Sequence, residues 1–271
     1  MKQYIFLVTN TLTLILTLVV NYLSGTGYFN GKTVGDVSAQ YDTLITPSGY
    51  AFGIWGLIYI LLLAFIIFLW YSWLKNKYDR ELNQTSIWFA ISNIFNASWI
   101  IFWVNGYIGA SVIIILLLLL SLIILTLRLK LEIWDAPMRI IFFVWWPFCI
   151  YLGWIIAATV VNIALYVKTL GWNMLGLTET SWTVIMIVVA TLIYVFLIFS
   201  RNMREAALVG IWAFVAIAVK QWNVNESIVM SSLAASLVLF ILITFHAYRN
   251  KRTLPHRKIA RWRRLKDVED L

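Results

Sequence analysis

Long apolar runs separated by short polar segments dominate the chain. A membrane span needs about 20 mostly apolar residues, and eight segments fit that description. They are residues 4–23, 50–73, 87–105, 108–128, 140–167, 182–200, 204–220 and 227–248. Pro147 in the fifth run is expected to kink its helix. The pattern predicts an all-α fold, a polytopic membrane helical bundle of about eight transmembrane helices.

The composition supports a membrane protein. Of the 271 residues, 62% are hydrophobic and 12% are charged, and the mean hydropathy is +0.85. A soluble domain is about half apolar and about a quarter charged. We therefore expect lipid to be the solvent for most of the chain, without a separate soluble domain.

Lysine and arginine fall mostly on one side of the predicted spans. If the N-terminus is cytoplasmic, only three of the 21 basic residues, Lys32, Lys168 and Lys220, lie outside. Cytoplasmic loops of membrane proteins carry such an excess. The distribution predicts that both termini are cytoplasmic.

The net charge of +9 is concentrated at the end of the chain. Nine basic residues lie between Arg249 and Lys266, after the last apolar run. Such a tail is typical of an orientation signal and a contact for anionic membrane lipid. Because no nucleic-acid-binding module accompanies the charge, we expect no nucleic-acid partner.

One outside loop, Ser24–Gly49, is longer than the other connections. It is rich in glycine and contains Asp36, Asp42 and Pro47, so it is too polar for the bilayer. Loops of this length often cover a binding site. A plain connector is the other interpretation of this segment.

The residues that usually hold metals or perform catalysis are few. The chain has one cysteine, Cys149, and two histidines, His246 and His256, and none of them stands at metal-ligand spacing. Glu132 and Asp135 flank a tryptophan in a cytoplasmic loop, which is typical of a solvated turn. We expect no catalytic residue, no metal ligand and no required cofactor.

Three local patterns resemble the TspO/MBR family (tryptophan-rich sensory protein / peripheral-type benzodiazepine receptor). The second span has Pro47, then Phe52-Gly53, Trp55 and Tyr59. The third span has Asn96-Ala97-Ser98-Trp99 followed by Phe102, and the fifth has Trp154 with Ala158-Thr159 and Asn162. The second span has one residue fewer between glycine and tryptophan, and one proline fewer, than the family pattern. The resemblance covers residues 1–170.

The resemblance implies a bundle of five helices around a pocket for flat apolar ligands such as porphyrins, haem or sterols. It also implies a homodimer. The chain would then divide into a TspO-like five-helix bundle (1–170), three additional transmembrane helices (171–248) and a basic cytoplasmic tail (249–271). The ligand-binding residues that the resemblance implies are Trp55, Tyr59, Asn96, Trp99, Trp154, Thr159 and Asn162.

The chemistry of these residues is compatible with such a pocket. In the predicted topology they lie near the outer ends of spans two, three and five, where they can meet beneath the long loop. Indole rings offer broad π-faces, and amides buried in a membrane need a hydrogen-bond partner. Small residues such as Gly53 and Gly56 would permit close helix approach. The alternatives are interfacial anchoring for the tryptophans and helix–helix contact for the asparagines.

These observations predict an integral membrane protein that binds a tetrapyrrole-like or sterol-like ligand as a sensor or carrier. A bacterial plasma membrane is the expected location. A membrane enzyme acting on a lipid-soluble substrate, including light-dependent porphyrin degradation, is an alternative. A small secondary transporter is another.

Overall fold

The computed structural model describes residues 2–41, 43–77, 79–171 and 176–250, and every regular element in these ranges is helical. The basic tail predicted for residues 249–271 lies outside the described residues except for its first two positions. The elements are α1 (Lys2–Gly25), α2 (Val34–Gln40), the 3₁₀ helix η1 (Gly49–Gly53), α3 (Ile54–Leu74), α4 (Asp79–Thr85), α5 (Trp88–Val104), α6 (Ile108–Arg128), α7 (Met138–Ile140), the π-helical η2 (Ile141–Trp145), α8 (Trp146–Thr169), α9 (Glu179–Arg201), α10 (Arg204–Gln221) and α11 (Glu226–Arg249).

The predicted helical membrane bundle is confirmed. Six helical segments are long and apolar enough to cross a bilayer: Lys2–Gly25, Gly49–Leu74, Ile108–Arg128, Met138–Thr169, Glu179–Arg201 and Glu226–Arg249. The other two predicted spans are also helices. The apolar α5 has 17 residues, and α10 has 18 with three charged side chains. A count of eight spans is consistent with these helices.

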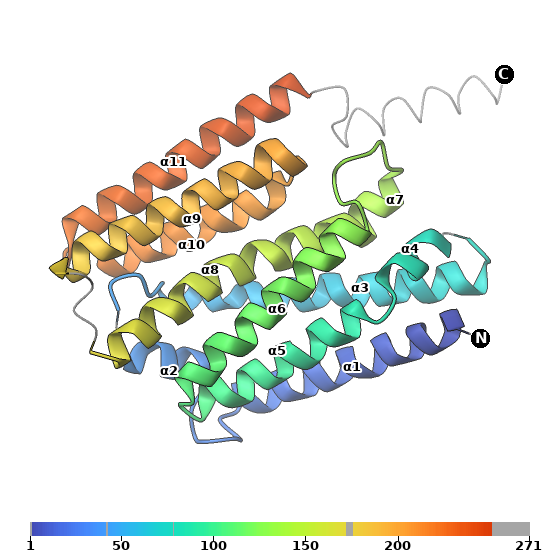
Figure 1. The fold of residues 1–271 in the computed structure, drawn as a ribbon, viewed down its shortest axis with the longest axis horizontal. Helices are drawn as coiled ribbons and strands as arrows, with labels where there is room; N and C mark the ends of the chain where they lie inside the picture. The colour runs from blue at the N-terminus through green and yellow to red at the C-terminus, as the bar shows by residue number, and fades with distance from the viewer. Residues whose placement is uncertain (1, 42, 78, 172–175, 251–271) are drawn as a thin grey trace.

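The helices run side by side along one axis (Figure 1). Helix α1 begins, and α11 ends, at the same end of the bundle, together with α4 and α7, while α2 lies at the opposite end. Helix α8 contacts α3, α6 and α10, and α9 and α11 pack against α10. The last three spans are therefore attached to the first five through α8.

Close packing of α8 on α10 depends on a glycine. A Cβ added at Gly153 would lie 2.7 Å from the backbone oxygen of Ala206. By contrast, a Cβ added at Gly53 or Gly56 would meet nothing within 4 Å. The expectation that Gly53 and Gly56 permit close helix approach is wrong, since their Cα atoms face open space.

The irregularity expected at Pro147 takes the form of a π-helical turn. Proline lacks the N–H that would continue the α-helical ladder. The five residues before Trp146 are π-helical, and α8 then continues without interruption to Thr169. This turn sets the orientation of the side chains that α8 presents farther along.

The long loop folds over one end of the bundle and is fastened there. Trp103 Nε1 donates to the Val34 carbonyl at 3.1 Å, and Asn30 Nδ2 donates to the Val104 carbonyl at 3.1 Å. On the other side, the Ser48 N–H donates to the Ala216 carbonyl at 3.0 Å. The loop therefore joins α5 of the first five spans to α10 of the last three.

Candidate functional site

An enclosed aromatic cavity lies beneath this loop. It is lined by three of the predicted residues, Trp55, Trp99 and Trp154, each from a different helix. The other lining side chains are mostly aromatic or small: Ser38, Ile45, Pro47, Phe52, Trp103, Ala157, Ala158, Val160, Val161, Ala190, Tyr194, Ala213, Phe214 and Ile217. We call this space the aromatic cavity.

Trp55 is the centre of the ring network. Its ring lies 6.3 Å from the rings of both Trp99 and Trp154, measured between centroids. It also stacks on Tyr59 at 5.5 Å, and Trp99 stacks on Trp103 at 5.5 Å. The cavity therefore presents several indole faces at different angles, which suits a flat conjugated ligand.

The long loop and the last three spans complete the walls. Ser38, Ile45 and Pro47 come from the loop, which thus covers a cavity. That the loop covers a binding site stays a prediction. Tyr194 comes from α9 and Phe214 from α10. Without α9 and α10, the first five spans would leave one side of this cavity open.

Two polar atoms at the cavity are shielded from solvent and have no hydrogen-bond partner among the described residues. They are Trp154 Nε1 and Ser38 Oγ, on side chains that are 2% and 1% exposed. An unpartnered buried donor costs about 1–3 kcal/mol. A hydrogen-bond acceptor placed in the cavity would remove this cost for Trp154.

The aromatic cavity is small, with a volume of about 40 Å³. An open side groove of about 530 Å³ lies next to it, between α1, α3 and the loop. Trp55 and Phe52 line both spaces, so their rings form the partition between them. Tyr59 lines the side groove only.

Asn96 is buried and hydrogen-bonded to other side chains. Its Nδ2 donates to the Tyr151 hydroxyl at 2.8 Å, while its Oδ1 accepts from Asn21 at 3.2 Å and from the Tyr59 hydroxyl at 3.4 Å. Asn96 does not line the aromatic cavity. Its amide joins α1, α3, α5 and α8, and ligand contact by Asn96 stays a prediction.

Asn162 is equally well paired. Its Oδ1 accepts from Trp99 Nε1 at 2.9 Å, and its Nδ2 donates to Ser111 Oγ at 3.0 Å. Asn162 does not line the aromatic cavity, but its hydrogen bond fixes the orientation of the Trp99 ring, which does. Thr159 donates to the Ile155 carbonyl of its own helix and lines a separate apolar groove between α6, α8 and α9.

Several lining residues were not predicted from the sequence. Trp103 was not distinguished from tryptophans that anchor at the membrane surface, and Phe52 belongs to the family-like pattern but was not selected. Tyr194 and Phe214 carry no motif at all. Only the fold brings α9 and α10 to the cavity, so no local signal in the sequence identifies these two residues.

The fold and the aromatic cavity define a polytopic α-helical membrane protein of the ligand-binding class. A family model described as TSPO-like protein matches residues 6–245. The chain belongs to this TSPO-like family, as the three local patterns predicted. The match continues past residue 170 through the last three spans. No curated protein and no solved structure gives a significant match.

Proposed function

We propose that the aromatic cavity binds a flat, conjugated, largely apolar ligand of the tetrapyrrole class, and that the protein senses or carries this ligand. The main support is the meeting of Trp55, Trp99, Trp103 and Trp154 around one cavity with an unpartnered indole N–H. Membership of the TSPO-like family supports the same class of function.

The ligand must displace part of the cavity wall. Ligand sites of small molecules have volumes of about 300–1,000 Å³, far above the 40 Å³ of the closed cavity. The side groove supplies about 530 Å³. If Trp55 and Phe52 rotate, the two spaces join into one of suitable size. We therefore propose that the ligand enters between α1 and α3.

Polar recognition would come from the loop and α8. Trp154 Nε1 can only donate a hydrogen bond, whereas the Ser38 hydroxyl can donate or accept. Both are buried at the cavity. A tetrapyrrole offers acceptors in its carboxylates and ring nitrogens.

The test is a porphyrin titration of the full chain purified in detergent, followed by quenching of tryptophan fluorescence. We expect saturable binding with about one ligand per chain. Trp154→Ala should weaken it at least tenfold, because both an indole face and a buried, unpartnered indole donor of the cavity are lost. Trp222→Ala is the matched control, since Trp222 is 60% exposed and lies at the end of α10.

Two outcomes would contradict the proposal. One is quenching that does not saturate, and the other is equal loss of affinity in Trp154→Ala and Trp222→Ala. Repeating the titration in the dark and under light separates a binding protein from an enzyme that degrades porphyrin. Only the enzyme would form a product that depends on light.

The proposal includes the plasma membrane of a bacterium, with both termini in the cytoplasm. The support for this orientation is the charge distribution, because only Lys32, Lys168 and Lys220 would lie outside. The aromatic cavity would then lie toward the outer face of the membrane.

A further inference from the structure

A second cavity, polar rather than aromatic, lies at the opposite end of the bundle from the long loop. Its volume is about 250 Å³, and it lies between the α6–α7 connection, the start of α10 and the end of α11. Its lining includes Glu132, Asp135, Arg204, Glu205 and His246. We call it the polar cavity. The proposed ligand site does not use it.

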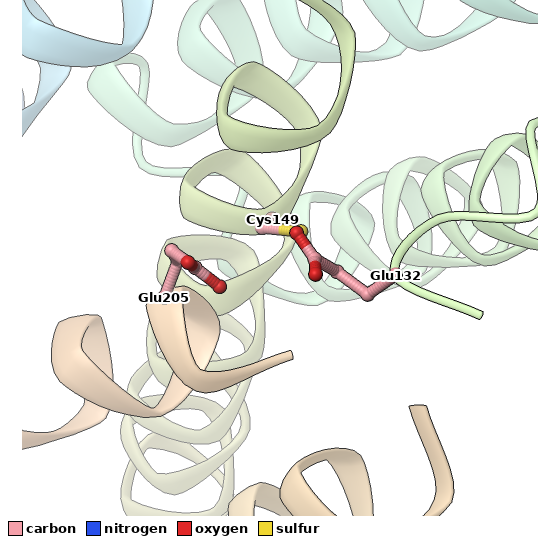
Figure 2. Close-up of side chains that lie close together, drawn as sticks. All are labelled: Glu132, Cys149 and Glu205. Atoms are coloured by element: carbon pink, nitrogen blue, oxygen red, sulfur yellow. The ribbon is translucent and has the colours of Figure 1, made fainter. Parts of the chain in front are cut away.

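Three ligand-type side chains meet beside this cavity. A carboxylate oxygen of Glu132, the sulfur of Cys149 and a carboxylate oxygen of Glu205 all lie within 4.8 Å of one another. They come from three separate segments and point toward a common centre (Figure 2). The three residues are far apart in the sequence, so their spacing does not indicate a metal site. The expectation that the chain has no metal ligand therefore needs a direct test.

The polypeptide around these side chains is fixed by hydrogen bonds. Asn202 Nδ2 donates to the Glu132 carbonyl at 2.7 Å, which ties the α6–α7 connection to the turn before α10. Arg201, at the end of α9, donates to the Thr126 carbonyl in the last turn of α6 at 3.0 Å. The close approach of Glu132 to Glu205 is therefore a property of the packed backbone.

One carboxylate oxygen of Glu205 has no hydrogen-bond partner among the described residues, although the positive charge of Arg204 acts on the group. This oxygen, Oε2, is shielded from solvent, and Glu205 makes no ion pair with a described residue. Two carboxylates and a thiol close together in a shielded place repel when ionised. A bound cation would remove this repulsion.

His246 supplies an independent indication of a ligand. It is 6% exposed, it lines the polar cavity, and its Nδ1 has no hydrogen-bond partner among the described residues. Its other ring nitrogen, Nε2, lies 3.0 Å from the Asn250 amide. The amide nitrogen Nδ2 is the atom that faces Nε2, and in this orientation the ring proton sits on Nδ1. Turning the amide by 180° would make its oxygen accept from Nε2–H and leave the Nδ1 lone pair for a metal. Histidines that bind metals are commonly oriented by such a second hydrogen bond.

We propose that Glu132, Cys149 and Glu205 bind one zinc-like divalent transition-metal ion. His246 lies outside the 4.8 Å group and would have to move in from the polar cavity as the fourth ligand. Thiolate, imidazole and carboxylate are the ligands that zinc takes in proteins. Calcium and magnesium prefer oxygen ligands only, and the cysteine disfavours them. Zinc bonds of about 2.0–2.3 Å place ligand atoms roughly 3.3–3.8 Å apart, so the side chains need to close by about an ångström.

The test uses the full chain in detergent after metal removal. Zn²⁺ binding is measured by competition with a chromophoric chelator, and Co²⁺ serves as a spectroscopic probe. We expect one equivalent of metal per chain and a thiolate-to-cobalt charge-transfer band in the near ultraviolet. Cys149→Ser should abolish the band, and Cys149→Ser, Glu205→Gln and His246→Asn should each lower zinc affinity at least tenfold.

Matched substitutions serve as controls. Glu179→Gln changes a carboxylate at the other end of the bundle, and His256→Asn changes the other histidine; both should keep wild-type affinity. Tryptophan emission and elution volume check that each variant is folded. Absence of binding, or binding that Cys149→Ser and Glu205→Gln leave unchanged, would overturn the site. Wild-type affinity in His246→Asn alone would overturn the fourth ligand.

Discussion

Two indoles of the aromatic cavity differ at the scale of a single hydrogen bond. Trp99 Nε1 donates to Asn162, whereas Trp154 Nε1 has no partner among the described residues. Both rings are almost fully buried, with exposures of 4% and 2%. The first indole therefore contributes to the stability of the fold, whereas the N–H of the second is the donor that the proposed ligand would use.

Replacing each indole by phenylalanine separates these roles. Trp99→Phe removes a buried hydrogen bond and should lower the free energy of unfolding by about 1–3 kcal/mol. Trp154→Phe removes no hydrogen bond within the protein, so it should cost less stability but weaken porphyrin binding by about 2- to 10-fold. Denaturant unfolding and the fluorescence titration measure the two effects. The reverse ranking in either measurement would contradict this division.

Residue types predicted the cavity better than they predicted the role of each residue. Trp55, Trp99 and Trp154 line the same cavity. The sequence predicted this because the three family-like patterns place them near the outer ends of three different helices.

The role of Asn96 and Asn162 could not be assigned from the sequence. The residues next to an asparagine in the chain are the same whether its amide bonds to another helix or to a ligand. Only the distances to Tyr151 and Ser111 show that these amides already have partners in the protein.

At the scale of helices, the contact between α8 and α10 holds the two parts of the bundle together. Long apolar runs predicted both helices, but the sequence does not say which faces touch. The answer depends on Gly153, where α8 approaches the backbone of α10.

Gly153→Ala should therefore be destabilising. The new methyl group would lie 2.7 Å from the Ala206 backbone oxygen and 2.9 Å from its Cα. Helices must then separate, at a cost of about 1–3 kcal/mol. Gly56→Ala is the control, since nothing lies within 4 Å of its Cβ; it should stay within about 1 kcal/mol of wild type. Thermal unfolding in detergent compares them, and equal midpoints would refute the role of Gly153.

The short helix α2 in the loop depends on a pair of reciprocal hydrogen bonds. The Asp36 carboxylate accepts from the Thr33 backbone N–H at 2.8 Å, and Thr33 Oγ1 accepts from the Asp36 N–H at 3.2 Å. The backbone hydrogen bond, followed by that from the Thr33 hydroxyl, lowers the pKa of Asp36 from its ordinary value of 3.8. The stabilisation is thus complete above pH 3.8 and is lost as the pH falls through the lowered pKa.

Hydrogen exchange of the α2 amides tests this pH dependence. Asp36→Ala should exchange faster than wild type by a constant factor at neutral and mildly acidic pH, after correction for intrinsic rates. The difference should disappear once the wild-type carboxylate is protonated, below its lowered pKa. A difference that stays constant as the pH falls through this titration would mean that the charge does not contribute.

At the scale of the whole molecule, the distribution of basic residues gives a topology that can be measured. A Lys32→Cys variant should react with a membrane-impermeant maleimide on intact cells, and Lys130→Cys only after permeabilisation. The native Cys149 has an exposure of 0%, so it gives little background. Labelling of Lys130→Cys on intact cells would reverse the orientation.

The walls of the aromatic cavity also have a consequence for how the protein is made. They extend from Ser38 near the start of the chain to Ile217 near its end. Because a chain leaves the ribosome from its N-terminus, Trp55 and Trp154 are synthesised well before Phe214 closes the space around them. Until α10 joins α8, lipid can reach those indoles. If the proposed ligand binds in this cavity, a chain arrested before the seventh predicted span lacks one wall of the site and should not retain the ligand.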